Sequence, residues 1–389
     1  MRKTYYGYRK RSQLMIIAFA TTVALMLNSC IQKHTNYGIT GTPVINAQGN
    51  KVTILVAANE GTTHSENGGF RKTTYRTTYW LKQYETVSGK FIQKKKLLTP
   101  PENEQQSVSC YGGYDNKIWL YVNGITAYDI NSLEEITNEK KIAIANGVKK
   151  TIFPYGDRLI YPSIENGYID LIADNGDQYR LLLDDLSITK KELLKKEDTR
   201  KKTNNFSLLN GDVYGTRCDT LLNKVYIFAK DSITAAGITP ANTSISEVAF
   251  RMKLYSSNFS LQKLGSHTSV SYDAIQRLTE TTFLNPCFIK DTDKDQVMHF
   301  SNPDGFMIIH QDVPGENSKA LITKIDTNGK IIWEAKTGIS TKISACIFQN
   351  NYCLIVANKD YMLSPHIGKD ALCIVNTSNG NIIQPLLSE

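Results

Sequence analysis

The sequence has few histidines and none of the short motifs that mark the common enzyme classes. Only six histidines occur in 389 residues, and they are scattered without the spacing of metal ligands. A Gly-x-Ser-x-Gly turn, a His-Glu-x-x-His pair, a Cys-x-x-Cys pair and a glycine-rich phosphate loop are all missing. These absences exclude the recognisable serine hydrolases, zinc peptidases, dithiol oxidoreductases and P-loop enzymes, and they favour a non-enzymatic role.

Acidic residues are missing from the first 29 positions. Residues 1–13 contain five basic side chains, and an uncharged apolar run follows from Leu14 to Leu27. This is the layout of a secretory signal. The apolar run has fourteen residues, whereas a membrane-spanning helix needs about 20. We therefore expect residues 1–29 to be a cleaved signal peptide rather than an uncleaved anchor.

The segment Leu27-Asn28-Ser29-Cys30 resembles the bacterial lipobox, in which the cysteine thiol is diacylated and becomes the new N-terminus. The resemblance implies cleavage after residue 29 and a lipid on Cys30. Two acyl chains anchor a protein durably, whereas one chain anchors it only marginally. We expect residues 30–42 to be a lipid-anchored tether and residues 43–389 to be the folded domain, with the membrane as a partner through the lipid.

Acidic residues are also missing directly after Cys30, where the chain continues Ile31-Gln32-Lys33-His34. Acidic residues at this place keep some lipoproteins in the inner membrane, and an acidic run resembles surface-export signals. We therefore expect an outer-membrane lipoprotein that faces the periplasm, with the cell surface as the alternative.

Little net charge remains once the signal peptide is removed. The formal charge falls from +8 to +3, because the leader holds five positive charges and no negative one. A balance of this size over 360 residues does not indicate a nucleic-acid partner.

Cysteines are few, and six remain besides Cys30. An even number in an exported chain permits disulfides without requiring them. Cys346 and Cys353 flank the polar triplet Gln349-Asn350-Asn351, so a tight hairpin would place them opposite each other. The pair is either a disulfide or two buried free thiols.

Helical periodicity is scarce after the leader, and short runs with strand composition recur instead. Examples are residues 51–57, 117–122, 158–161, 224–229, 305–310 and 352–357. The Asn-Gly dipeptide, a strong hairpin signal, begins at Asn67, Asn123, Asn146, Asn166, Asn175, Asn210, Asn328 and Asn379. The pattern predicts an all-β chain of antiparallel hairpins.

Several segments resemble one another, each consisting of a strand, a polar turn and a strand: residues 84–91, 128–133, 325–330 and 374–380. Another apolar pair precedes most of them, which gives a unit of four strands in roughly 40 to 50 residues, the size of a propeller blade. The chain length predicts a β-propeller of about seven four-stranded blades, with six or eight as alternatives. Polar insertions are expected at 59–72, 190–205 and 231–246. The competing architecture is a pair of β-sandwiches joined by the charged segment 190–202.

The segment from Ile325 to Trp333 resembles the outer hairpin of the pyrroloquinoline-quinone-type propeller repeat. The resemblance implies that Asp326 and Gly329 shape the turn and that Trp333 packs between blades. It extends to uncharacterised bacterial lipoproteins with this PQQ-like repeat. Quinoprotein dehydrogenases of this type hold their cofactor with adjacent cysteines, which this chain lacks, so no quinone or other cofactor is expected.

Two further patterns suggest sites. Asp291, Asp293 and Asp295 alternate in one loop, and such carboxylates can converge on Ca²⁺, with a solvated acidic loop as the alternative. Thr220 and Ser232 each follow an aspartate and precede an aliphatic residue, which resembles a bacterial O-glycosylation acceptor.

The expected function is that of a lipid-anchored envelope scaffold, because propeller blades present loops at both ends of a rigid frame. Its partner would be another envelope protein or a ligand. The alternative is an envelope hydrolase or lyase that acts on glycan or peptide through carboxylates in a central channel.

Overall fold

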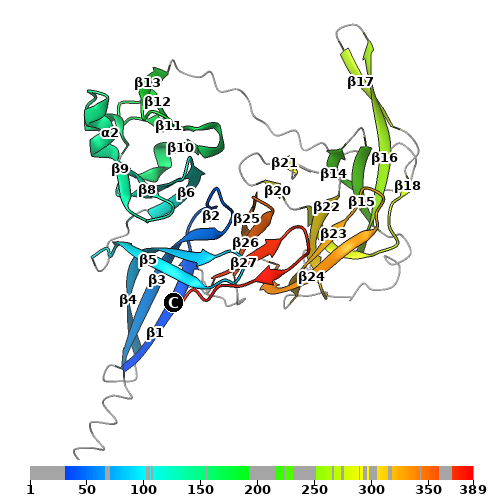
Figure 1. The fold of residues 1–389 in the computed structure, drawn as a ribbon, viewed down its shortest axis with the longest axis horizontal. Coiled ribbons are helices and arrows are strands. Elements are labelled where there is room, and N and C mark those ends of the chain that lie inside the picture. The colour runs from blue at the N-terminus through cyan, green and yellow to red at the C-terminus, as the bar shows by residue number, and fades with distance from the viewer. Residues whose placement is uncertain are drawn as a thin grey trace, which may run out of the picture.

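The computed structural model describes residues 31–65, 71–101, 106, 108–154, 156–191, 215–221, 224–230, 251–264, 267–272, 276–288, 290–291, 296–297, 305–313, 318–341, 343–358 and 370–388. Antiparallel strands form most of this part of the chain (Figure 1). The prediction of an all-β fold is confirmed. No helix in the ranges above has the length and hydrophobicity needed to cross a bilayer.

The first three sheets are antiparallel meanders in chain order. Sheet A runs β1 (Ile31–Ile39), β3 (Lys51–Ser65), β4 (Arg71–Glu85) and β5 (Phe91–Leu98), with β2 (Val44–Ile45) also paired to β3. Sheet B runs β6 (Val108–Tyr114), β7 (Lys117–Val122), β8 (Ile125–Asp129) and β9 (Glu135–Asn138), and the helix α2 (Glu139–Ala145) follows it. Two short helical turns, η1 (Lys150–Ile152) and η2 (Asp157–Leu159), lead to sheet C, which runs β10 (Ile160–Ser163), β11 (Tyr168–Ile172), β12 (Gln178–Leu182) and β13 (Ile188–Lys191), with the turn η3 (Ile164–Asn166) after β10.

The second half of the chain forms one large sheet and one small sheet. Sheet D has nine strands: β14 (Gly215–Leu221), β15 (Lys224–Lys230), β16 (Arg251–Leu264), β19 (Phe283–Phe288), β22 (Phe306–Gln311), β23 (Lys319–Ile325) and β24 (Ile331–Ser340), with β17 (His267–Tyr272) and β18 (Gln276–Arg277) paired to β16. The pair β20 (Lys290–Asp291) and β21 (Gln296–Val297) stands apart from it. Sheet E runs β25 (Ile343–Gln349), β26 (Tyr352–Asn358), β27 (Asp370–Asn376) and β28 (Ile382–Ile383).

Central strands are buried on both faces, which explains their continuous apolar runs. In β7, Ile118 and Leu120 pack against sheet A, while the alternating residues Trp119 and Tyr121 pack against sheet C. In β26, successive residues likewise alternate between a core shared with sheet A and a core shared with the β22–β24 part of sheet D. Because side chains alternate along a strand, one strand serves two cores. The sheets therefore stack in the order C, B, A, E, D.

Sheets A and E, which are the first and last sheets along the chain, are in direct contact. Tyr84 of β4 donates its hydroxyl to the carbonyl of Leu386 at 3.2 Å, and Ile39 of β1 donates its amide to the Asp370 carboxylate of β27 at 2.8 Å. The buried core between them joins Ile54 and Val56 to residues of sheet E. The two ends of the described chain are thus joined across one apolar interface.

The predicted blade pattern holds only in part. Sheets B, C and E are four-stranded, but β14 to β24 form one continuous sheet, and no sheet closes on itself. The continuity arises because β19 pairs with β16 through Arg251 and Met252 and also pairs with β22. Blade count and blade closure are therefore not shown.

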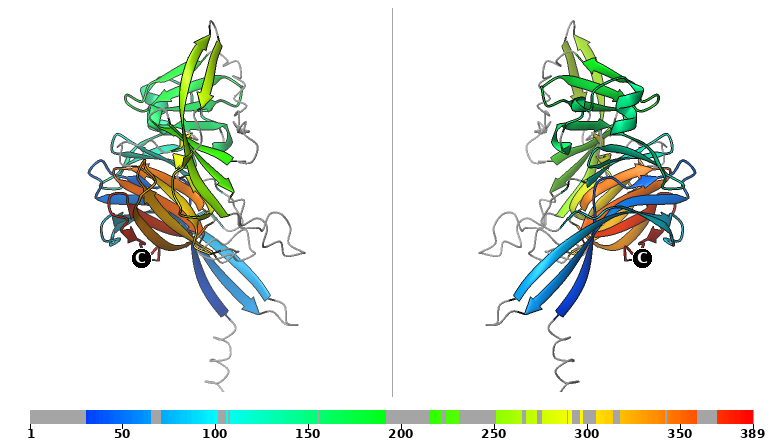
Figure 2. Two further views of the ribbon diagram at one scale, coloured as in Figure 1. Left: turned by 90° about the vertical axis from the view of Figure 1, so that its right-hand side faces the viewer. Right: turned by 90° about the vertical axis from the view of Figure 1, so that its left-hand side faces the viewer.

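Strands occupy parts of two segments expected to be a tether and a polar insertion. Residues 31–39 of the expected tether form β1, and most of the expected insertion at 59–72 continues β3 and β4 as a hairpin. We call the outer part of this unit the stalk ribbon: residues 31–36, 59–65 and 71–78. It projects from the body of the molecule in Figures 1 and 2. Residues 192–205 and 231–246 of the other expected insertions lie outside the described residues.

Candidate functional site: a pocket between sheets A and B

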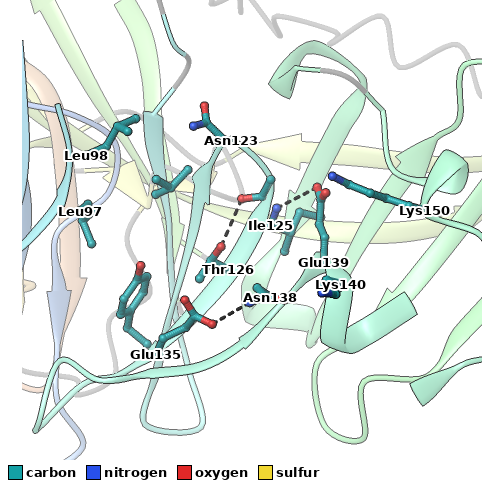
Figure 3. A pocket seen from close by; sticks show the side chains of 13 residues that line it. Leu97, Leu98, Asn123, Ile125, Thr126, Glu135, Asn138, Glu139, Lys140 and Lys150 are labelled. Atoms are coloured by element: carbon teal, nitrogen blue, oxygen red, sulfur yellow. Dashed lines mark hydrogen bonds between the residues drawn. The ribbon is translucent and has the colours of Figure 1, made fainter. Parts of the chain in front are cut away.

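A cavity of about 390 Å³ opens where the end of β5 meets sheet B and the start of α2. Figure 3 shows the residues that line it, which combine apolar, amide, carboxylate and ammonium side chains. They are Leu97, Leu98, Val122, Asn123, Gly124, Ile125, Thr126, Tyr128, Glu135, Asn138, Glu139, Lys140 and Lys150. The cavity is thus polar on one side and apolar along β5.

Helix α2 positions the carboxylate of this pocket. Asn138 caps its N-terminus and accepts a hydrogen bond from the Lys141 amide at 3.0 Å. Ile142 and Ala143 pack into the core between sheets B and C. Glu139 lies three and four residues before them, so the helical repeat turns it inward too. The first turn of a helix also favours an acidic side chain.

The Glu139 carboxylate lies against the β7–β8 turn. Its Oε1 accepts the Ile125 amide at 2.9 Å, and the side chain is buried (Figure 3). Gly124 has a φ of +141°, and a Cβ built on it would lie 2.7 Å from the Glu139 Cδ. Asn123 before it also has a positive φ. The Asn-Gly turn therefore gives both the hairpin and the space that the carboxylate occupies.

Burial raises the pKa of Glu139, and the Ile125 hydrogen bond and the Lys150 charge oppose that rise. Burial also raises the pKa of Tyr128, with the Glu135 charge adding to it. A buried carboxylate gains stability from any cation or hydrogen-bond donor that enters its cavity. The site is therefore suited to a small polar group that brings a positive charge or donors.

Glu135 is the second carboxylate of the pocket and is more exposed. It accepts the Asn138 side-chain amide at 2.7 Å and the Lys141 ammonium at 3.3 Å. Lys140 and Lys150 add two cations at the rim. The site thus presents acceptors and donors that differ in depth, which is how binding pockets orient a ligand.

Of the residues predicted for calcium, lipidation and glycosylation, the structure describes Asp291 and Thr220, and neither lines this pocket. Asp291 lies in β20, whereas Asp293 and Asp295 lie outside the described residues, as do Cys30 and Ser232. Thr220 is in β14. Over the ranges given above, no three histidine, cysteine or acidic side chains are placed to hold a metal.

Cys346 and Cys353 lie on adjacent strands, but they do not pair directly. Cys353 pairs with Phe348, and Cys346 pairs with Ile355, so the two cysteines are diagonal neighbours with sulfur atoms 3.6 Å apart. They are free thiols in this structure, buried with Cys373 in one apolar core. The neighbouring Cys346 thiol, followed by burial, raises the pKa of Cys353, and burial raises that of Cys373 to about 12. A disulfide between Cys346 and Cys353 stays a prediction.

Sequence reasoning missed the pocket entirely. The one usable signal was Asn138 followed by Glu139, an N-cap with an acidic first turn. The helix has only seven residues, too few for a periodic pattern to stand out among strands. The contact between Glu139 and Gly124 spans fifteen residues, and no local pattern encodes it.

Comparisons with known proteins give no family. No family model and no curated protein matches the sequence. One solved structure it resembles is a Mycobacterium tuberculosis puromycin-hydrolyzing peptidase, at 8% identity and a TM-score of 0.22, over 89% of this chain and 52% of that chain. Another is a complex of S. cerevisiae Dbp5 with Nup159, Gle1, IP6 and ADP, at 9% identity and a TM-score of 0.24, over 91% of this chain and 94% of the other. The chain spans about half the length of the peptidase chain it matches. Similarities this weak carry no argument about fold or function.

Proposed function

We propose that this protein is a lipid-anchored envelope β-propeller that acts as a non-enzymatic scaffold and binds its partner through the pocket between sheets A and B. The observation that carries the proposal is the stacking of the sheets in the order C, B, A, E, D, with an apolar core between each pair of neighbours, one of which joins A and E, the first and last sheets along the chain. Sheets that bury both faces against neighbours in this way are the units of a propeller.

The placement of the strands supports the proposal. The first strands of sheets B, C and E, namely β6, β10 and β25, lie toward the middle of the view in Figure 1. The last strand of sheet B, β9, and the helix α2 lie at its edge. Only two residue pairs join β16 to β19. Dividing sheet D at that weak point gives two blades, so the described sheets account for six. The Trp333 ring nitrogen donates to the Thr377 carbonyl, directly after β27 of sheet E, at 3.3 Å, which supports a position of this side chain between two blades.

The proposed anchor is the diacylated Cys30, and the proposed location is the periplasmic face of the outer membrane, as the sequence predicts. A rigid frame of stacked sheets with a polar pocket on its loops suits the recognition of another envelope protein. A lysine or an N-terminal amine of that partner, inserted beside Glu139, would neutralise the buried carboxylate.

The experiment is crosslinking in intact cells followed by mass spectrometry, comparing the wild-type protein with Glu139→Gln and Glu135→Gln. The control is Asp174→Asn, which changes an exposed carboxylate in the turn between β11 and β12. The proposal is supported if the wild type and the control capture the same partner and Glu139→Gln captures at least fivefold less of it. Equal capture by all four proteins overturns the role of the pocket.

A second candidate function is an envelope hydrolase or lyase acting on glycan or peptide. It is favoured by the pairing of a buried carboxylate of raised pKa, Glu139, with the exposed Glu135 in one cavity. Both residues belong to β9 and α2, which lie at the edge of the view in Figure 1. Cleavage of peptidoglycan fragments by the wild type, lost in Glu139→Gln but retained in Asp174→Asn, would establish the enzyme and displace the scaffold proposal.

A further inference from the structure

The stalk ribbon is fixed close to the proposed lipid by covalent geometry. Ile31 follows Cys30 directly, so their Cα atoms are separated by about 3.8 Å in any trans conformation. Ile31 pairs with His64, and His64 pairs with Lys72. Paired strands lie about 4.8 Å apart, so the backbone of Lys72 lies roughly 10 Å from that of Ile31. The end of the hairpin is therefore held at the level of the anchor.

The ribbon also separates the end next to Cys30 from the body of the molecule. The strand β5 pairs with β4 only from Tyr79 onward, and the buried core of β3 ends at Ala58, with Gly61 buried beyond it. Residues 59–65 add seven positions, or about 23 Å at the usual rise per residue. Beyond the core, the side chains of Glu60, Thr74 and Tyr75 are exposed. An exposed ribbon of this length, with an amphipathic tyrosine among polar side chains, suits the aqueous and headgroup layers beside a membrane.

The charge of the ribbon is positive. It carries four Lys or Arg residues, namely Lys33, Arg71, Lys72 and Arg76, and among its residues Glu60 is the single acidic one. Glu60 is the register partner of Arg76, and Glu66 follows Ser65 in the chain. Four basic residues against two acidic ones leave a net charge of +2 in this part of the sequence. The Debye length at physiological salt is about 8 Å, and attraction to a charged surface requires this kind of proximity.

We propose that the end of the stalk ribbon binds the headgroups of anionic phospholipids and so fixes the orientation of the body on the membrane. This inference rests on the proposed lipidation of Cys30. The lipid holds the chain at the bilayer, and the ribbon's cations then meet phosphate groups on either side of the anchor. The contact is electrostatic, because basic residues outnumber acidic residues in this part of the chain.

The experiment uses the full lipoprotein reconstituted into vesicles, with the photoreactive residue p-benzoylphenylalanine in place of Thr74. Thr74 is exposed and pairs with Thr62, the register partner of Lys33. The control carries the same residue in place of Tyr161, a side chain of sheet C that is 52% exposed. We expect at least a fivefold excess of phospholipid adducts from position 74. Equal yields from lipidated protein overturn this inference alone, whereas absence of lipid on Cys30 by mass spectrometry overturns the anchor and the inference with it.

A second experiment tests whether the contact requires the basic residues. Arg71→Glu together with Lys72→Glu should lower the adduct yield from position 74 by about fivefold or more, given the attraction that each basic residue contributes at an anionic surface. The matched control is Lys330→Glu together with Lys336→Glu, two exposed lysines of sheet D and its β23–β24 turn, which should leave the yield unchanged. The same loss should occur when phosphatidylglycerol vesicles are replaced by phosphatidylcholine vesicles. Adduct yields that stay the same after both the double substitution and the change of lipid would overturn the assignment to anionic lipid.

Discussion

The Glu139 carboxylate illustrates how a single residue can be costly to the fold and useful to a site. Its one backbone partner in the pocket is the Ile125 amide at 2.9 Å, and burial raises its pKa. A carboxylate that is harder to ionise in the folded chain than in the unfolded chain favours folding when it is protonated. Its contribution is therefore fully present below the unfolded pKa of about 4.3 and is lost as the pH rises through the higher folded value.

Glu139→Gln should accordingly be more stable than the wild type at pH 7, because the glutamine carbonyl still accepts the Ile125 amide and no charge is buried. The advantage should disappear below pH 4.3, where the wild-type carboxyl is protonated in both states. Urea midpoints measured from pH 3 to pH 8 would show this convergence. A variant that is less stable than the wild type at pH 7 would mean that Lys150 compensates the buried charge fully.

At the scale of elements, the Asn-Gly dipeptides show what the sequence can and cannot encode. Among the dipeptides in the part of the chain that the structure describes, only at Asn123 do both residues take positive φ, as the hairpin rule requires. At Asn175, Asn328 and Asn379 the glycine alone does so, in longer turns, and at Asn146 and Asn166 the dipeptide ends a helical turn. The dipeptide reliably marked a change of direction, because glycine permits left-handed backbone. It did not specify which element ended there.

Strand positions were predictable because they depend on local composition. The runs 117–122, 224–229 and 352–357 all coincide with observed strands, β7, β15 and β26. Pairing between distant strands was not predictable, since the β16–β19 contact that merges two expected blades depends on packing. The pocket was missed for the same reason, because its carboxylates and its Asn-Gly turn meet only in the folded chain.

Gly124→Ala tests how tightly the turn and the helix are fitted. A methyl group there would lie 2.7 Å from the Glu139 Cδ and would also force alanine into a φ of +141°. We expect a loss of about 2 kcal/mol or more in the free energy of unfolding, measured by urea denaturation. Gly147→Ala is the matched control, because its φ of +62° is strained but nothing lies within 4 Å; it should cost about 1 kcal/mol.

The same change in a Glu139→Ala background separates the two causes. Removing the carboxylate relieves the clash but leaves the backbone strain, so Gly124→Ala should cost less there than in the wild type. Equal costs in both backgrounds would show that the turn conformation, and not the close approach of Glu139, requires glycine.

At the scale of the whole molecule, the contact between sheets A and E determines whether the stacked sheets act as one unit. Lys82 of β4 is 3% exposed, and its ammonium donates to the Leu387 carbonyl at 2.5 Å. Leu387 itself lies in the shared apolar core. The last residues of the chain therefore satisfy a buried charge and cover the first sheet at the same time.

Deleting residues 385–389 should destabilise the protein by about 2 to 4 kcal/mol, because it removes a buried leucine and an acceptor of a buried ammonium. Deleting only residues 388–389 is the control and should have little effect, since Ser388 is exposed. Lys82→Met in the shortened chain should recover part of the loss, because the deletion removes one acceptor of a buried ammonium, whereas an apolar side chain needs none. If sheets A and E form one cooperative unit with the rest, thermal unfolding of the shortened chain should remain a single transition at lower temperature. A separate early transition would instead show that sheet A unfolds independently, and the ring proposed for this protein would lose the interface that joins its two ends.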